Sequence, residues 1–228
     1  MIKGVIFDID GVLLDTMPLW NSVGSSYLRK CGIEPPNGID KILFSMSMEQ
    51  GAQYLHDNFL QGKTAEDING EIKKYLEDFY MNRAEAKVGA DGILRLFADS
   101  GIPMAAATLS PRAHVKAALE RNALLGYIGK IFTTGEMNTS KSEPLIYNTA
   151  AEYLGTNPRD TLVFEDSLYA LRTAAQAGFV TVGVADSGEP NQDALMAEAD
   201  VFVENYKNDY IKLADLLGQQ RITDDRTT

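Results

Sequence analysis

The sequence predicts an α/β fold in which a parallel sheet forms the core and an all-helical domain is inserted. Two observations predict the sheet: short β-branched and aromatic runs recur along the chain, and helical patterns separate most of them. Strands that alternate with helices form parallel sheets that are covered on both faces. A third observation predicts the insertion, because the alternation stops between about residues 16 and 87, where the periodicity is helical.

The predicted strands are short apolar runs, as is typical of strands buried on both faces. They comprise residues 4–8, 103–108, 131–134, 161–164, 180–184 and 200–203. The helical patterns between them comprise residues 92–97, 112–120, 144–154 and 167–177. Gly155 and Gly178 follow the last two patterns at the position where a left-handed residue ends many helices.

The inserted segment contains several amphipathic helical patterns, around residues 19–28, 48–59 and 65–86. Gly32 and Pro35 end the first of them. We therefore expect a core domain formed by residues 1–15 and 88–228, and a helical cap domain formed by residues 16–87.

Composition and charge restrict the class of protein. Hydrophobic residues make up 45% of the 228 residues, which is enough for a packed core. The net charge of −11 argues against nucleic acid or an anionic membrane as a partner. A single cysteine, Cys31, excludes an intrachain disulfide, and neither a signal-peptide pattern nor a membrane-spanning run is present. We expect a soluble, cytoplasmic protein that is a monomer or a weak homodimer.

Polar side chains follow the predicted strands where each strand ends. Asp8 and Asp10 follow the first strand, and Thr108 and Ser110 lie at the end of the second. Two adjacent carboxylates at a buried strand end repel each other unless a cation or a shared proton offsets the repulsion. Ligands bind beyond the carboxyl ends of parallel strands, so this edge of the sheet is the predicted site.

Two later segments add groups to the same edge. Glu165 and Asp166 follow the fourth predicted strand, and Lys141 precedes the helical pattern at 144–154. Carboxylate oxygens are the ligands that Mg²⁺ prefers, and Mg²⁺ commonly binds substrate phosphate as well. The residues therefore predict a Mg²⁺ and phosphate site in which Lys141 supplies further positive charge.

Each motif alone also has an ordinary structural explanation. Asp8 and Asp10 are compatible with a simple turn, Thr108 and Ser110 with helix caps, and Lys141 with a solvated surface charge. The functional interpretation depends on all the motifs occurring in order at one sheet edge. Competing motifs fail, because the chain contains no glycine-rich dinucleotide fingerprint, no phosphate-binding P-loop, no calcium loop and no nucleophile elbow.

Taken together, these motifs resemble those of the haloacid dehalogenase (HAD) superfamily, and specifically its β-phosphoglucomutase-like and phosphatase branch with a helical cap. The first motif corresponds to Asp8-x-Asp10-Gly11-Val12 and the second to Thr108-Leu109-Ser110. Lys141, with Pro144 after it, corresponds to the third motif, and Glu165-Asp166-Ser167 to the fourth. The resemblance covers nearly the whole chain and implies a Rossmann-like core.

The resemblance also implies roles for individual residues. Asp8 is expected to attack phosphorus and form an aspartyl-phosphate, with Asp10 as general acid and base. Mg²⁺ is expected to be held by Asp8, Asp10 through its backbone carbonyl, and Asp166. Glu165 is expected to be either a further ligand or a group that supports the ligands. The residues expected to bind the phosphoryl group are Thr108, Ser110 and Lys141.

The chain departs from the resemblance in the helical segment. Phosphoglucomutases of this branch carry an arginine that holds a second phosphate where this chain has Met48, and a histidine where it has Trp20. Losing that cation weakens a mutase cycle. We therefore predict a Mg²⁺-dependent phosphatase acting on a small phosphorylated metabolite, with Trp20, Met48 and Glu49 as candidate substrate contacts. The alternatives are a phosphohexomutase and a non-catalytic module that binds phosphate or metal.

Overall fold

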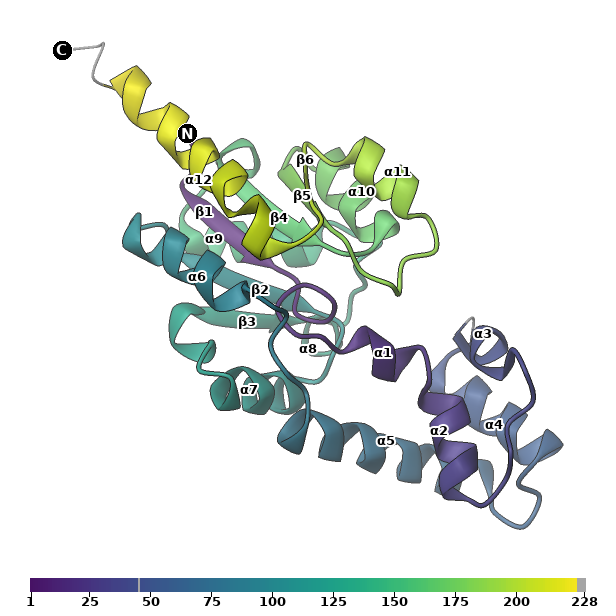
Figure 1. Ribbon diagram of the computed structural model, residues 1–228. Coiled ribbons are helices and arrows are strands. Elements are labelled where there is room, and N and C mark those ends of the chain that lie inside the picture. Colours follow the sequence, from purple (N-terminus) through teal and green to yellow (C-terminus); the bar gives the residue numbers. More distant parts are fainter. Residues whose placement is uncertain (45, 225–228) are drawn as a thin grey trace. The chain divides into compact units, whose positions relative to one another are not determined.

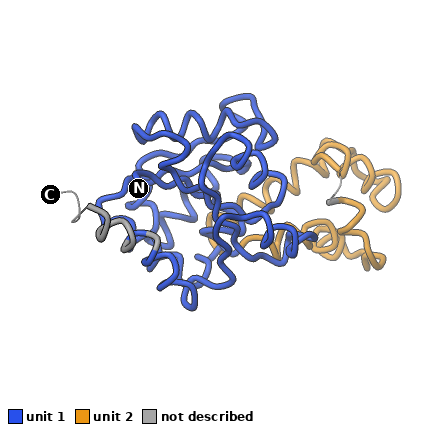
Figure 2. Tube along the Cα trace, turned by 90° about the horizontal axis from the view of Figure 1, so that it is seen from above, with its two compact units in different colours: residues 1–15, 84–228 blue, residues 16–83 orange. Residues whose placement is uncertain are grey.

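The computed structural model describes residues 1–44 and 46–224, and the chain divides into two compact units (Figures 1 and 2). Unit 1 contains Met1–Asp15 and the chain from Ala84 onward, and unit 2 is Thr16–Arg83. The sequence places the second boundary after Lys87, whereas the structure assigns residues 84–87 to unit 1. In the part of the chain that is described, no helix combines the length and the apolar character needed to cross a membrane.

Unit 1 is built on a parallel sheet of six strands in the order β3-β2-β1-β4-β5-β6. The strands are β1 (Gly4–Phe7), β2 (Met104–Thr108), β3 (Lys130–Thr133), β4 (Thr161–Glu165), β5 (Val180–Val184) and β6 (Val201–Val203). The helices are α6 (Ala90–Asp99), α7 (Arg112–Arg121), α8 (Thr134–Met137), α9 (Leu145–Leu154), α10 (Leu168–Gln176), α11 (Gln192–Glu198) and α12 (Tyr206–Asp224). The predicted α/β fold with a parallel sheet is confirmed.

Helices pack on both faces of the sheet, which explains why most residues of its strands are apolar and buried. On one face, Ile6 of β1 belongs to a cluster with Ile146 and Tyr147 of α9. On the other face, the ring of Phe7 contacts Phe97 of α6 at 6.1 Å and Phe164 of β4 at 4.5 Å between centroids. Successive residues of β1 thus anchor opposite layers, as the two-residue period of a strand requires.

The register of the sheet brings the strand ends together. Phe7 lies opposite Ala106 of β2 and Phe164 of β4. The residues that follow these positions, including Asp8 and Glu165, therefore reach the same edge of the sheet. The sequence predicts this edge as the site because parallel strands share a direction.

Unit 2 contains the helices α1 (Met17–Trp20), α2 (Val23–Lys30), α3 (Ile39–Phe44), α4 (Met48–Asn58) and α5 (Ala65–Asn82). Leu28, Leu55 and Ile72 lie in its core, on three different helices. Ser47 and Thr64 form capping boxes at the starts of α4 and α5.

Two helical predictions for unit 2 need correction. The pattern at 19–28 forms two helices, because the Ser22 hydroxyl donates to the Pro18 carbonyl at 2.6 Å and the chain turns there. The pattern at 65–86 ends at Asn82, since residues 85–87 bond to residues 13–15 instead of continuing the helix.

We expect Phe97→Ala to lower the free energy of unfolding by about 3–5 kcal/mol, because it removes a fully buried ring between two aromatic neighbours. Urea denaturation followed by circular dichroism measures the effect. The matched control is Met196→Ala, which truncates a side chain that is 51% exposed in the same unit. Equal unfolding midpoints for the two variants would contradict the packing described here.

Candidate active site

A buried ion cluster lies at the carboxyl edge of the sheet in unit 1. Asp8 directly follows β1, Glu165 ends β4, and Asp166 comes next in the chain. All three side chains are buried, as is Lys141, which is 2% exposed and lies in the turn before α9. The backbone N–H of Asp8 donates to the Phe164 carbonyl at 2.9 Å, which extends the β1–β4 pairing to the site itself.

The ammonium group of Lys141 joins two of these carboxylates. Its Nζ lies 2.6 Å from Asp8 Oδ1 and 2.7 Å from Glu165 Oε1. The hydroxyl of Tyr147, in the first turn of α9, also donates to Glu165 Oε1 at 2.7 Å. Lys141 therefore lies at the centre of the site, not on the surface.

Burial and neighbouring charge shift the ionisation of the cluster. Burial raises the pKa of Asp8 well above its usual value, and Lys141 opposes that shift while Glu165 and Asp166 add to it. The pKa of Asp166 rises to about 8, chiefly through burial and then through the charge of Glu165. Burial disfavours the charged form of Lys141, but Asp8 and Glu165 outweigh it and raise the pKa of the ammonium.

The three carboxylates have the geometry and chemistry of a divalent cation site. One oxygen from each of Asp8, Glu165 and Asp166 lies within 4.8 Å of the others. Glu165 Oε2 is buried and has no hydrogen-bond partner among the described residues. A buried carboxylate oxygen without a donor is costly, and a bound cation removes that cost. Clustered hard oxygen ligands of this kind fit Mg²⁺.

Asp10 and the end of β2 form a second part of the site. The Ser110 hydroxyl donates to Asp10 Oδ2 at 2.6 Å, and the Ser110 N–H donates to Thr108 Oγ1 at 3.0 Å. Thr108 and Ser110 are both buried. The structure thus brings the Ser110 hydroxyl to Asp10, where it orients the carboxylate, and the Thr108 hydroxyl fixes the backbone of Ser110.

The three remaining candidates lie in unit 2 and have partners within it. Trp20 Nε1 donates to Tyr80 at 2.9 Å, and Trp20 and Met48 both pack in part against the core of that unit. Glu49 lies 3.7 Å from Lys73 and also accepts a hydrogen bond from Asn69. Their role as substrate contacts stays a prediction.

Sequence reasoning missed two tyrosines of the site. Tyr147 bonds Glu165, and burial together with that charge raises the pKa of its phenol, which keeps it a donor. Tyr169 is 46% exposed, and its partial burial raises the pKa of the phenol to about 12; the charge of Lys141 lowers this pKa and the charge of Glu165 raises it. Tyr147 lies on the buried face of the helix that directly follows the turn with Lys141. This position in the sequence is the feature from which a contact with the site could have been predicted.

Comparison with known proteins identifies the family. A family model described as "Haloacid dehalogenase-like hydrolase" matches residues 5–184. The chain belongs to the haloacid dehalogenase-like hydrolase family. The predicted superfamily is confirmed by this match.

Relatives of this haloacid dehalogenase-like hydrolase carry phosphatase names. Hexitol phosphatase A of Escherichia coli (strain K12) is 28% identical over 186 residues, which cover 80% of this chain and 82% of that protein. Phosphorylated carbohydrates phosphatase of Thermotoga maritima is 24% identical over 203 residues, covering 89% and 94%. A solved structure of a putative β-phosphoglucomutase from Thermotoga maritima has a TM-score of 0.81 and 23% identity, covering 96% and 99%. The last likeness shows the fold alone, and the relatives agree with the predicted enzyme class of phosphoric monoester hydrolase.

In metal-free protein, we expect stability to fall as the pH rises from about 4 to about 8. Folded Asp166 keeps its proton up to about pH 8, whereas the unfolded carboxyl group loses it near 3.8, so the unfolded state releases protons first. The slope from this one group is at most about 1.4 kcal/mol per pH unit. Urea midpoints at several pH values in EDTA measure it, and Asp166→Asn should flatten the dependence.

The control for that experiment is Asp160→Asn, which removes a carboxylate that pairs with Lys3 outside the site. Its pH dependence should match that of the wild type. Parallel curves for the wild type and Asp166→Asn would show that the raised pKa of Asp166 is wrong.

Proposed function

We propose that this protein is a Mg²⁺-dependent phosphatase that hydrolyses a small phosphomonoester, such as a sugar phosphate, through an aspartyl-phosphate on Asp8. The observation that carries the proposal is the buried cluster in which Lys141 bridges Asp8 and Glu165 while Glu165 Oε2 has no donor among the described residues. Phosphoryl transfer depends on positioning and on neutralising charge. The cluster supplies a positioned carboxylate, one cation and a set of oxygen ligands for a metal ion. The phosphatase names of its relatives support the same conclusion.

Asp8 is the proposed nucleophile. A carboxylate oxygen of Asp8 forms a bond to phosphorus as the bond from phosphorus to the leaving oxygen breaks. Lys141 holds Asp8 Oδ1 at 2.6 Å and so fixes the direction of the carboxylate before the reaction. With Thr108, Lys141 is also proposed to bind the phosphoryl oxygens.

Asp10 is the proposed acid and base. It donates a proton to the leaving oxygen in the first step and accepts a proton from the attacking water in the second. That second step releases phosphate and restores the Asp8 carboxylate. The hydrogen bond from Ser110 keeps the Asp10 carboxylate in one orientation for both transfers.

The proposed Mg²⁺ ligands are the carboxylates of Asp8, Glu165 and Asp166, together with the backbone carbonyl of Asp10. When bound, the ion neutralises carboxylates that otherwise repel both one another and an anionic substrate. Lys141 supplies one positive charge to this group of three acidic side chains, so ionising all three calls for a further cation. Tyr147 maintains the orientation of Glu165 in either state.

We expect Asp8→Asn to reduce phosphate release at least about 10³-fold, because it removes the nucleophile. The assay is inorganic phosphate release from a panel of sugar phosphates, nucleotides and polyol phosphates with Mg²⁺. EDTA should abolish release by the wild type, and Asp160→Asn should leave release unchanged. An active Asp8→Asn protein would contradict the covalent mechanism. A wild-type protein without Mg²⁺-dependent turnover would favour a non-catalytic module that binds phosphate or metal.

A second assay separates the phosphatase from a phosphohexomutase. The enzyme is mixed with β-glucose 1-phosphate, a bisphosphate primer and Mg²⁺, and the products are followed over time. We expect inorganic phosphate without accumulation of glucose 6-phosphate, because Met48 supplies no cation for a second phosphate. Efficient formation of glucose 6-phosphate would instead identify a mutase.

A further inference from the structure

Lys87 makes an unusually complete set of hydrogen bonds for a lysine outside the ion cluster. Its ammonium group donates to the carbonyls of Gly11 and Ala185, the latter at 2.8 Å, and to Asp186 Oδ2 at 2.7 Å. An ammonium has three N–H donors, so all of them are used. The side chains of Lys87 and Asp186 are 19% and 5% exposed, and the pair is therefore largely shielded from water.

The three acceptors connect parts of unit 1 that are far apart in sequence. Gly11 follows Asp10 and has a φ of 76°, a conformation that favours glycine. Ala185 and Asp186 follow β5, where Ala185 N–H donates to Val203 at 2.8 Å and Asp186 Oδ1 accepts from Gly188 at 3.0 Å. Lys87 thus joins the turn after Asp10 to a loop that the sheet already holds in place.

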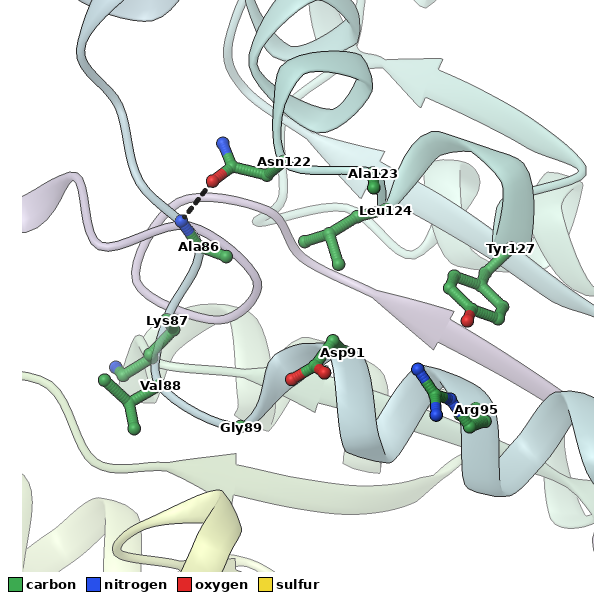
Figure 3. Close-up of a pocket in the computed structure, with 10 residues that line it drawn as sticks. All are labelled: Ala86, Lys87, Val88, Gly89, Asp91, Arg95, Asn122, Ala123, Leu124 and Tyr127. Carbon is green, nitrogen blue, oxygen red and sulfur yellow. Dashed lines mark hydrogen bonds between the residues drawn. The ribbon is translucent and has the colours of Figure 1, made fainter.

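The backbone on either side of Lys87 is fixed as well. Lys87 N–H donates to the Leu13 carbonyl at 2.9 Å. Asn122 accepts from Ala86 N–H at 2.9 Å (Figure 3). Its amide group also donates to the Ala84 carbonyl at 2.9 Å. Residues 86–88 also border a cavity of about 410 Å³. Because packing covers this segment only in part, its hydrogen bonds contribute to holding it in place.

We propose that Lys87 is a positioning residue for the reaction, because it holds the Gly11 carbonyl and thereby the turn that carries Asp10. This inference rests on the proposed function. The Gly11 carbonyl lies one peptide unit beyond the Asp10 carbonyl, and both the carboxylate and the carbonyl of Asp10 have proposed roles. A small displacement of such groups lowers a rate steeply, by up to about 100-fold for 1 Å.

The experiment replaces the ammonium chemically in the full-length protein. Lys87→Cys is made together with Cys31→Ala, which removes the one native cysteine. The protein is alkylated in urea and refolded, either with 2-bromoethylamine, which restores an ammonium at the same distance, or with bromoethane, which leaves the stem neutral. We measure kcat, KM, the Mg²⁺ concentration for half-maximal activity, and the rise in melting temperature that Mg²⁺ causes without substrate.

The neutral product should have a kcat about 10- to 100-fold lower with little change in KM, and a smaller Mg²⁺-induced rise in melting temperature. The ammonium product should recover both properties. Equal kcat values for the two products, whether both are high or both are low, would overturn the proposal. Lys3→Met, which breaks an exposed ion pair in the same unit, should leave kcat unchanged.

A second variant separates positioning from folding. Lys87→Met leaves the buried Asp186 carboxylate without its cation, which destabilises the fold. Lys87→Met with Asp186→Asn removes that unpaired charge, and we expect it to regain most of the unfolding midpoint but not kcat. Recovery of kcat along with stability would show that Lys87 acts only on folding. If neither the wild type nor the Cys31→Ala parent has Mg²⁺-dependent phosphatase activity, the proposed function fails, and the Mg²⁺-induced rise in melting temperature still tests Lys87.

Discussion

The buried contact of Lys141 with Asp8 and Glu165 is the interaction on which the site depends. Without the ammonium, three acidic side chains would lie together at the end of a hydrophobic sheet, and none of the described residues would bring a cation into contact with Asp8 or Glu165. Burying an ion pair costs desolvation energy, which is recovered only when the geometry is good and further hydrogen bonds are made. Tyr147 supplies one such bond, while the second oxygen of Glu165 receives none from the described residues. The fold therefore stabilises a site whose charge is only partly balanced.

The two sides of the Asp8–Asp10 segment differ in a way that suits two different tasks. Asp8 lies among buried charges and is held by an ammonium, whereas Asp10 is held by the neutral hydroxyl of Ser110. Two carboxylates whose surroundings differ so much can act as nucleophile and as proton carrier in the same reaction. The difference comes from the segments that meet at this edge of the sheet. Ser110 follows β2, whereas Lys141 lies in the turn before α9.

The sequence was sufficient to predict the sheet and the edge at which polar residues gather, because apolar runs and their polar ends are local patterns. It did not predict the bond from Tyr147 to Glu165, since a tyrosine on an apolar helix face has the same pattern whether it meets a carboxylate or only packs. The Lys87 contacts were also missed, because their acceptors are two backbone carbonyls and an aspartate distant in sequence. Such contacts depend on the tertiary register of the chain, which no local pattern contains.

The pairing of residues 13–15 with residues 85–87 has a consequence for how far the inserted helical unit can vary in sequence and length. The chain leaves unit 1 and returns to it at neighbouring positions. The helical unit is therefore a long insertion, and backbone hydrogen bonds join the segments before and after it. The entropy cost of closing such a loop grows only slowly with its length. The helical unit can therefore change in sequence or length while the sheet keeps its register. The topology separates the helices of unit 2 from the carboxyl edge of the sheet, where the buried ion cluster lies.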